Sequence, residues 1–279
     1  MRVYSVRKTI KTACLTTLAF VVGILFVSPL YLVFVNSVKS VKEIFLDPLG
    51  LPSKVMWSNF VRVTEKIDYL QAFMNTMFFV VFGVLGLIII CSMAAYRLSR
   101  HRTKLNNVVY LLLVSSILVP FQTVMIPLVK VMASLNLYNT RVGVLLAYYG
   151  YGIPFATFLF YGFLNSIPKE IEEAALIDGC SPFKVYLYVV LPLLKPICIT
   201  VAVLDVLWIY NDFLLPFVLI SDNSLRTLPL VMYTFFTAYE RPWDLAMASL
   251  TMVLTPAIIL FIFLQKRITG GIVTGAMKG

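Results

Sequence analysis

The sequence predicts an all-α, polytopic membrane protein with six transmembrane helices. Three observations support this: its composition, the lengths of its apolar segments and the distribution of its basic residues. Of the 279 residues, 60% are hydrophobic and only 13% are charged, whereas charged residues make up about a quarter of an average soluble domain. A soluble fold of this composition would expose large apolar patches and aggregate. A lipid bilayer is therefore the expected environment.

The apolar residues form six blocks, and each is long enough to cross a hydrocarbon core about 30 Å thick as a helix. The predicted spans cover residues 14–35, 73–95, 107–133, 142–164, 197–220 and 245–265. Basic residues precede the first block, as in a signal peptide. The apolar run continues past Pro29 without a small-residue cleavage site, so we predict a retained span. Prolines within the blocks bend their helices, which fits simple packing kinks as well as a protein that opens and closes.

Basic residues define the orientation of the spans. If the N-terminus is cytoplasmic, fourteen of the 23 Lys and Arg residues lie in inner segments, and six spans return the C-terminus to the cytoplasm. The strongest cluster, at residues 97–104, lies in a short inner loop, where the positive-inside rule has most weight. The formal charge of +10 is therefore attributed to orientation beside anionic lipid, and no nucleic-acid partner is expected.

The connection at residues 165–196 is a long cytoplasmic loop that we predict to contain two short helices. The first begins with Ser166 as its N-cap and ends at Gly179, a typical left-handed C-cap. The second begins at residues 181–182 and ends before residues 191–192. An apolar stripe along the first helix predicts that a partner protein or the membrane surface covers it, because a solvated loop needs no such stripe.

The sequence lacks the residues that catalysis or nucleotide binding in this chain would require. No G-x-x-x-x-G-K-[ST] loop occurs, so we expect no ATP binding here. One histidine and four cysteines without CxxC spacing indicate neither a metal site nor histidine-dependent catalysis. An intramembrane enzyme would need a nucleophile–base pair within the spans, and none is visible. We therefore expect a protein that is not an enzyme and that binds no cofactor or metal itself.

A longer motif in the cytoplasmic loop carries functional information. Residues 173–175 are Glu-Ala-Ala, Gly179 follows after three residues, and residues 189–192 are Val-Val-Leu-Pro after nine more. This spacing resembles the EAA loop of ABC-importer permeases, written EAA, three residues, G, nine residues and I-x-L-P, with valine in place of isoleucine. The resemblance implies that the first loop helix docks into a cytoplasmic ATPase. The residues implied to couple the two proteins are Glu173, Ala174, Ala175, Asp178, Gly179, Leu191 and Pro192.

Other segments narrow the resemblance to the carbohydrate-type permeases, in particular the second, maltose-like subunit. Residues 75–76 look like that family's Asn-Ser/Thr pair, residues 208–216 look like its W-N-[DE]-F-L-x-P stretch with an unusual opening, and residues 227–230 match its T-L-P-L segment. The tail at residues 265–279 is similar to its G-G-x-x-x-G-x-x-K-G terminus. The residues of this tail implied to contact the ATPase are Gly275, Lys278 and Gly279.

The resemblance implies a type I ABC importer permease, with a single transmembrane domain over residues 1–279, a permease core at 69–266 and the coupling loop at 165–196. Such a chain forms half of a translocation pathway in a bacterial cell membrane, with a di- or oligosaccharide as the expected solute. The implied partners are a second homologous permease, a dimeric ATPase that binds ATP and Mg²⁺, and an external solute-binding protein.

Two alternatives stay open. The solute could instead be glycerol phosphate or another small polar molecule. The chain could also be a self-sufficient secondary transporter in which Asp205 serves as the coupling group, although this would leave the EAA loop unexplained.

Residues for the substrate path are predicted from polar and aromatic side chains inside the spans, since ionisable groups there are functional hypotheses by default. Aromatic faces stack on sugar rings, and carboxylates and amides exchange hydrogen bonds with hydroxyl groups. Tyrosines near span ends also serve as interfacial anchors, and Asp212 could cap a helix or pair within the bundle. The predicted set is Asp205, Trp208, Asn211, Asp212, Tyr148, Tyr149, Tyr151 and Asn75.

Overall fold

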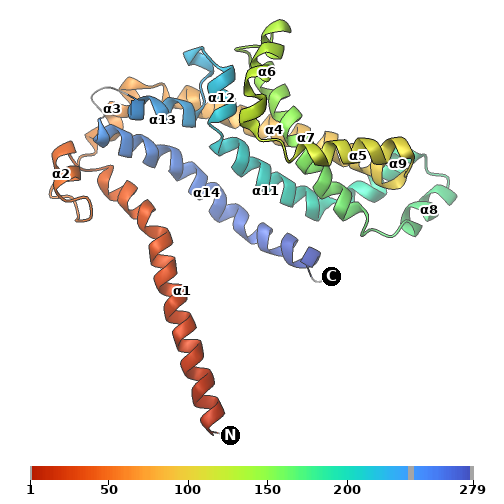
Figure 1. Cartoon of the computed structure of the whole chain (residues 1–279), viewed down its shortest axis with the longest axis horizontal. Helices are drawn as coiled ribbons and strands as arrows, with labels where there is room; N and C mark the ends of the chain where they lie inside the picture. Colours follow the sequence, from red (N-terminus) through yellow and green to blue (C-terminus); the bar gives the residue numbers. More distant parts are fainter. Residues whose placement is uncertain (1, 238–241, 277–279) are drawn as a thin grey trace. The chain divides into compact units, whose positions relative to one another are not determined.

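The computed structural model describes the backbone of residues 2–237 and 242–276, and the side chains of residues 12–237 and 242–263. Every regular element within these ranges is helical, which confirms the predicted all-α class (Figure 1). Four helices contain segments that are long and apolar enough to cross a membrane. These helices are α1 (Arg2–Asn36), α4 (Tyr69–Arg100), α7 (Arg141–Leu164) and α14 (Trp243–Ala276).

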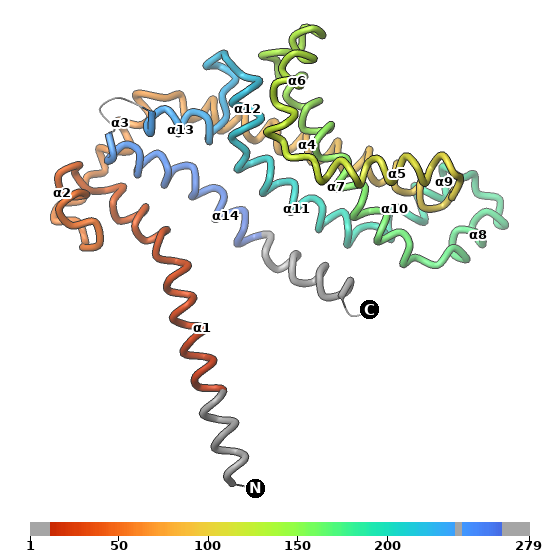
Figure 2. The backbone as a smooth tube through the Cα atoms, in the orientation of Figure 1, coloured from red at the N-terminus to blue at the C-terminus, as the bar shows by residue number. Residues whose placement is uncertain are grey.

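Two further spans are present only if each bent pair of helices counts as one, which brings the described total to the predicted six. The third predicted span is not continuous. It consists of α5 (Lys104–Ser116) and α6 (Phe121–Ser134), which meet at an angle of 108°, and Figure 2 shows this sharp turn. Pro120 has extended backbone angles at the N-cap of α6. Because proline has no N–H and disfavours a helical residue before it, the helix stops there.

The fifth predicted span, at 197–220, is also shorter than expected. Helix α11 (Lys195–Asn211) ends at Asp212, whose backbone is extended, and α12 (Leu214–Leu219) follows as a separate short helix. The Asp212 carboxylate accepts a hydrogen bond from the Leu214 N–H at 3.1 Å. This contact between residues two apart is an Asx-turn, so Asp212 stabilises the turn between α11 and α12, and Phe213 occupies the N-cap position of α12.

The chain divides into two compact units, of which the first comprises residues 1–68 and 232–255. It contains the short helices α2 (Val41–Leu46) and α3 (Ser58–Lys66) and part of α13 (Leu228–Thr237). Val63 packs with residues of α13 and α14 in a small apolar core. Arg62 forms a 2.7 Å ion pair with Asp244, and Asn59 donates to the backbone carbonyls of residues 37 and 39. The segment before α4 is therefore folded rather than an extended loop.

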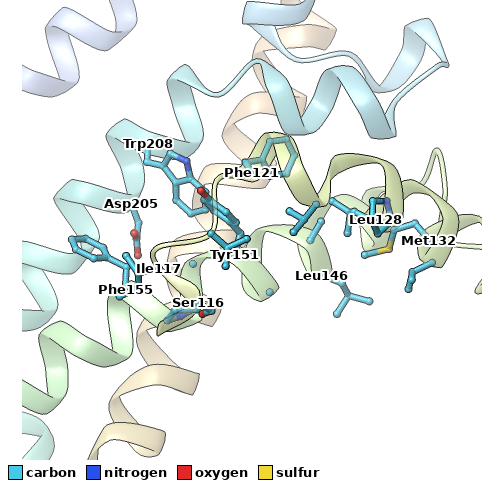
Figure 3. Close-up of a pocket in the computed structure, with 18 of the residues that line it drawn as sticks. Ser116, Ile117, Phe121, Leu128, Met132, Leu146, Tyr151, Phe155, Asp205 and Trp208 are labelled. Carbon is cyan, nitrogen blue, oxygen red and sulfur yellow. The ribbon is translucent and has the colours of Figure 1, made fainter. Parts of the chain in front are cut away.

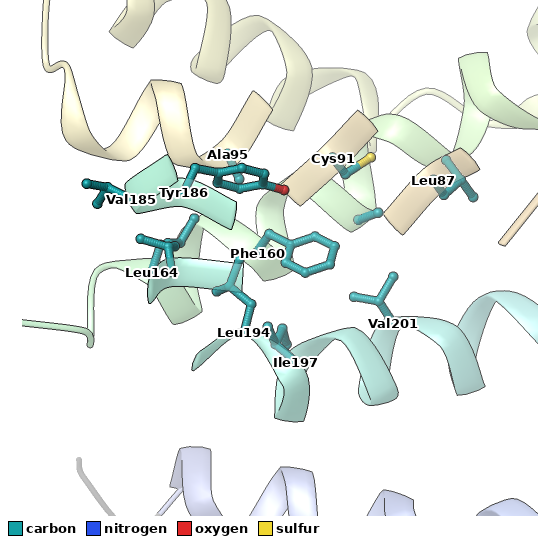
Figure 4. Packing of buried hydrophobic residues seen from close by; sticks show 12 residues of the cluster. Leu87, Cys91, Ala95, Phe160, Leu164, Val185, Tyr186, Leu194, Ile197 and Val201 are labelled. Atoms are coloured by element: carbon teal, nitrogen blue, oxygen red, sulfur yellow. The ribbon is translucent and has the colours of Figure 1, made fainter. Parts of the chain in front are cut away.

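The second unit, residues 69–231 and 256–279, contains both predicted sites. Its core lies where α4, α7 and α11 pack together, and Figure 4 shows the buried side chains that meet there. A Cβ atom on Gly152 of α7 would lie 2.7 Å from Leu87 of α4 and 3.2 Å from Trp208 of α11. In lipid, helices associate through close packing, so a glycine at this position allows the three helices to approach.

The loop at residues 165–196, predicted to be cytoplasmic, contains two helical segments, as expected, but their boundaries differ. The first, α8 (Glu170–Ile177), does not begin at Ser166; the hydroxyl group of Ser166 instead donates to the Phe163 carbonyl at the end of α7. The second does not end before residues 191–192. It runs from α9 (Pro182–Val185) through a π-helical turn, η1 (Tyr186–Val190), into α10 (Leu191–Leu193), and meets α11 at an angle of 70°. Ser181 caps its start, as expected from the sequence.

Candidate functional site

Helix α8 positions the residues that the motif predicted for coupling. Its first turn contains three glutamates, which complement the positive end of the helix dipole. Gly179 has a φ of +86°. The Gly179 N–H donates to the Leu176 carbonyl and the Cys180 N–H to the Ala175 carbonyl. This is a Schellman motif, in which glycine avoids the strain that a side chain would meet. The predicted left-handed cap at Gly179 is confirmed.

One face of α8 is exposed in the described structure. Glu173, Ala174, Asp178 and Gly179 all lie on the surface, and Ala175 is half-buried. Ile177 is 86% exposed, and Ile171 and Leu176 are exposed as well. Large apolar side chains gathered on so short a helix have an unfavourable contact with water. This face is therefore suited to contact a partner.

The opposite face of α8 holds an ion pair that the motif did not predict. Glu172 is buried, and its Oε1 atom lies 2.6 Å from Nη2 of Arg100, the last residue of α4. Arg100 Nε donates to the same oxygen at 2.8 Å, and the Tyr96 hydroxyl donates to Oε2 at 3.1 Å. In the sequence, Arg100 belongs to the basic cluster at residues 97–104 that was attributed to orientation in the membrane, and Glu172, in the first turn of α8, suits the helix dipole without any partner. The EAA pattern begins at Glu173, the next residue, so it does not point to the ion pair between Glu172 and Arg100.

Leu191 and Pro192 lie in α10, directly after the π-helical turn. Leu191 is half-buried against the core of the second unit, and Pro192 is exposed. They lie in the helical segment that leads from the loop into α11. Of the predicted tail residues, Lys278 and Gly279 lie outside the described residues, and for Gly275 only the helical backbone of α14 is described.

A cavity of about 780 Å³ lies in the second unit, between the α5–α6 turn, α7 and α11 (Figure 3). Most of its lining is aliphatic or aromatic. The polar groups among the lining residues are the Asp205 carboxylate, the Tyr151 and Ser116 hydroxyls and the Trp208 indole. An apolar cleft with a few polar groups is the usual form of a small-molecule site. Sequence reasoning missed the contribution of the α5–α6 turn, because it predicted one continuous span there.

Three of the predicted substrate-path residues line this cavity: Asp205, Trp208 and Tyr151. The ring centres of Tyr151 and Trp208 are 5.7 Å apart, and the ring of Phe121 packs edge-on with that of Tyr151 at 5.6 Å. Asp205 lies one helical turn before Trp208 and is only 3% exposed. Its Oδ2 atom accepts no hydrogen bond from any residue that the structure describes. The cavity thus combines aromatic faces with a carboxylate oxygen that lacks an internal donor.

Four other predicted residues do not line the cavity. Tyr148 is fully buried and packs edge-on against Trp208, with ring centres 5.6 Å apart. The Tyr149 hydroxyl donates to the Phe82 carbonyl at 2.8 Å. The Asn211 side chain donates to the carbonyl of Leu207 in its own helix. Asp212 stabilises the turn before α12, and its carboxylate interacts with the Tyr148 hydroxyl. Their predicted contact with substrate stays a prediction.

Asn75 lies away from the cavity, near the beginning of α4. Its Nδ2 donates to the carbonyls of Ser224 and Arg226, and its Oδ1 accepts from Arg141 at 3.0 Å. The neighbouring Thr76 hydroxyl accepts from the Leu228 N–H at 2.9 Å. Two segments that family resemblance singled out separately, residues 75–76 and 227–230, therefore contact each other. In the described structure Asn75 holds this connection in place.

Comparison with known proteins gives a family for the chain. The model of a family described as "Binding-protein-dependent transport system inner membrane component" matches residues 86–273. The chain is 41% identical over 264 residues to a probable permease for starch degradation products from Thermoanaerobacterium thermosulfurigenes, covering 95% of this chain and 96% of that protein. It is 34% identical over 266 residues to a melibiose, raffinose and stachyose import permease from Bacillus subtilis, again covering 95% and 96%.

Solved structures give the same fold. A chain of a bacterial ABC transporter involved in the import of the acidic polysaccharide alginate superimposes with a TM-score of 0.82 at 23% identity, covering 92% of this chain and 96% of that one. A second alginate transporter structure, in complex with a periplasmic protein bound to an alginate pentasaccharide, has a TM-score of 0.69 at 14% identity, covering 92% and 94%. At these identities the likeness establishes the fold.

Proposed function

Since the chain belongs to the family of binding-protein-dependent inner membrane transport components, we propose that it is a permease subunit of an ATP-driven sugar importer. It lies in a bacterial cell membrane with both termini in the cytoplasm and forms half of the translocation pathway with a second, homologous permease. ATP and Mg²⁺ bind to a separate dimeric ATPase. An external solute-binding protein delivers the sugar, as the alginate complex suggests for a protein of the same fold.

The observation that carries the proposal is the exposed face of α8, formed by the motif residues themselves. The helix has a closed Schellman end at Gly179, a small-residue surface at Ala174, and an exposed carboxylate at Glu173. Small residues permit close approach to a groove, and Glu173 is free to pair with an arginine of the ATPase. When ATP closes the ATPase dimer, α8 moves with it and shifts the spans between two packings, which is alternating access.

The cavity supports a neutral sugar as the solute. The Tyr151 and Trp208 rings offer faces for a pyranose ring, and the Asp205 carboxylate offers an acceptor for hydroxyl donors. No lysine or arginine is among the described residues that line the cavity, so an anionic solute finds no neutralising charge there. Neutral di- and oligosaccharides therefore suit the lining of this cavity better than glycerol phosphate does. The sugar relatives agree with this choice.

Co-purification tests the proposed ATPase contact. The unaltered protein, isolated from membranes of its own cells, is expected to bring an ATPase subunit with it. Glu173→Lys and Gly179→Asp are expected to lose that subunit. Glu65→Lys is the matched control, because it makes the same charge change on an exposed residue of α3, in a segment predicted to be external. An ATPase that is absent from the unaltered preparation, or that binds both variants unchanged, contradicts the coupling role of α8.

Transport in proteoliposomes tests the solute and the energy source. The complex with its binding protein is expected to take up a neutral oligosaccharide only when ATP is supplied to the ATPase side. Glycerol phosphate is the competing substrate, and an ion gradient without ATP is the competing driving force. Uptake driven by the gradient alone would support the secondary transporter instead.

A further inference from the structure

One stripe of α4 makes three polar contacts with the cytoplasmic loop. Ser92, Tyr96 and Arg100 are spaced by four residues, so they face the same side of the last turns of α4. The hydroxyl oxygens of Ser92 and Tyr186 lie 2.8 Å apart, which joins α4 to the π-helical turn. The rings of Tyr96 and Tyr186 are 5.3 Å apart, and the Tyr96 hydroxyl reaches Glu172 of α8.

Arg100 completes the stripe and binds two separate parts of the loop. Its Nη2 group lies 2.6 Å from Glu172 and also donates to the Ile167 carbonyl, between α7 and α8, at 3.2 Å. Arg100 and Glu172 have side chains that are each only 8% exposed. With Tyr96 on the second carboxylate oxygen, both oxygens of Glu172 have donors. The pair is therefore shielded from water and held in one geometry.

A buried pair of this kind resists separation. Pulling Glu172 away from Arg100 would leave two charges without partners and out of water, which costs far more than breaking an exposed ion pair. A displacement of α8 is thus easier when the end of α4 follows it. The partner-facing side of α8 is left free, because the anchor uses the opposite side of the helix.

We propose that Arg100, Glu172 and Tyr96 are positioning residues that link α8 rigidly to α4, so that movement of the loop is transmitted to this span. The inference rests on the proposed function, since it assumes that an ATPase moves α8. It assigns the two neighbouring glutamates different tasks: Glu173 faces the ATPase, and Glu172 transfers the movement inward. Coupling between distant sites requires such a contiguous, tightly packed connection.

The chain offers an internal control for this proposal. Arg102, two residues beyond the end of α4, donates to the Asn165 side chain at 2.9 Å, but this contact is exposed. Arg102 has the same charge as Arg100 and also contacts a residue at the end of α7, but its contact is exposed. Arg102→Gln should therefore leave coupling unchanged, whereas Glu172→Gln, which keeps the volume and removes the charge, should weaken it.

The experiment measures sugar uptake and ATP hydrolysis in the same proteoliposomes, using the complete importer with its binding protein. For Glu172→Gln we expect the ATPase to remain bound while the amount of sugar transported per ATP falls about tenfold, a usual size for a coupling energy. Tyr96→Phe, which removes one hydrogen bond and the lesser part of the link, should lower the ratio about threefold. The charge-swapped double variant Arg100→Glu with Glu172→Arg should restore part of the loss.

The outcomes separate this inference from the function on which it rests. If the unaltered protein shows no ATP-driven uptake, the proposed function fails. If the unaltered protein transports but Glu172→Gln and Tyr96→Phe keep its ratio of sugar to ATP, the link is wrong. Loss of ATPase binding in Glu172→Gln would also overturn it, because Glu172 would then be a docking residue. Should the Glu172→Gln permease itself fail to fold or to insert into the membrane, the ratio measured for Tyr96→Phe decides alone.

Discussion

Two acidic side chains in the second unit are both buried, but in different surroundings. Glu172, in α8, has donors on both carboxylate oxygens, two of them from one arginine. Asp205, at the cavity, is surrounded mainly by apolar side chains, and its Oδ2 lacks a donor among the described residues. Both belong to the same compact unit, so the difference reflects their local partners.

The contrast indicates what each carboxylate does. A fully paired charge stabilises one arrangement of two helices, and removing it damages that arrangement. A buried charge without an internal partner is costly to keep, and such groups within membrane proteins mark pathways for solutes or ions. We therefore expect changes near Glu172 to affect coupling or binding of the ATPase, and changes near Asp205 to affect the solute. Four predictions test this division.

The largest effect is expected for Gly152→Leu, at the junction between the cavity and the core. A Cβ atom there would already lie 2.7 Å from Leu87, so the larger side chain should destabilise the protein by about 2–3 kcal/mol. The thermal unfolding temperature in detergent measures this. Gly162→Leu is the control on the same helix, since nothing lies within 4 Å of its Cβ position. Equal unfolding temperatures for the two variants would contradict the packing role.

Asp205→Asn should lower sugar uptake without lowering the stability of the protein. We expect uptake of a neutral sugar to fall about tenfold, because an acceptor with a full charge contributes more than 1 kcal/mol to a hydrogen bond. The unfolding temperature should stay the same or rise, because a buried charge without a partner is removed. Uptake of labelled sugar and a thermal unfolding curve measure the two quantities. A clear loss of stability would show that Asp205, like Glu172, stabilises the packing of its helix.

Ile177→Ala should weaken binding of the ATPase without affecting the fold. The side chain is 86% exposed, so its truncation costs the isolated chain little. Burial against a partner would lose about 1 kcal/mol, or about fivefold in affinity. A titration of the ATPase against the purified permease measures this. Leu51→Ala is the control, because Leu51 is also largely exposed but lies in the predicted external segment. Identical affinities would argue against this face of α8.

The smallest effect is expected for Tyr151→Phe, which removes one hydroxyl group from the cavity. One neutral hydrogen bond to a sugar contributes about 0.5–1.5 kcal/mol, so uptake should fall about threefold. Tyr31→Phe provides the comparison, because Tyr31 lies outside the predicted substrate path and its hydroxyl donates within the protein to the Leu49 carbonyl. That variant should lose a little stability and keep its transport rate. The reverse pattern would show that the cavity is not the substrate path.

Features governed by a single stretch of chain were predictable from the sequence. The lengths of the apolar blocks predicted the helical class and six spans, because an apolar run of about 20 residues satisfies its own backbone hydrogen bonds in lipid only as a helix. The spacing of the EAA motif located α8 and its end at Gly179, since a left-handed cap depends on local backbone preference. Three of the eight predicted substrate-path residues line the cavity, and Asp205 among them was recognisable because an ionisable side chain within an apolar span is uncommon.

Other features depended on residues far apart in the chain, and only the tertiary structure decided them. The break between α5 and α6 forms one wall of the cavity, although an apolar block interrupted by proline is also compatible with a mere kink. Glu172 and Arg100 are separated by 72 positions, and no pattern in either segment indicates that they meet. A glutamate in the first turn of a helix suits the helix dipole whether or not it has a partner. The approach of α8 to the end of α4, which follows from the packing of α4 against α7, is what makes Glu172 part of an ion pair.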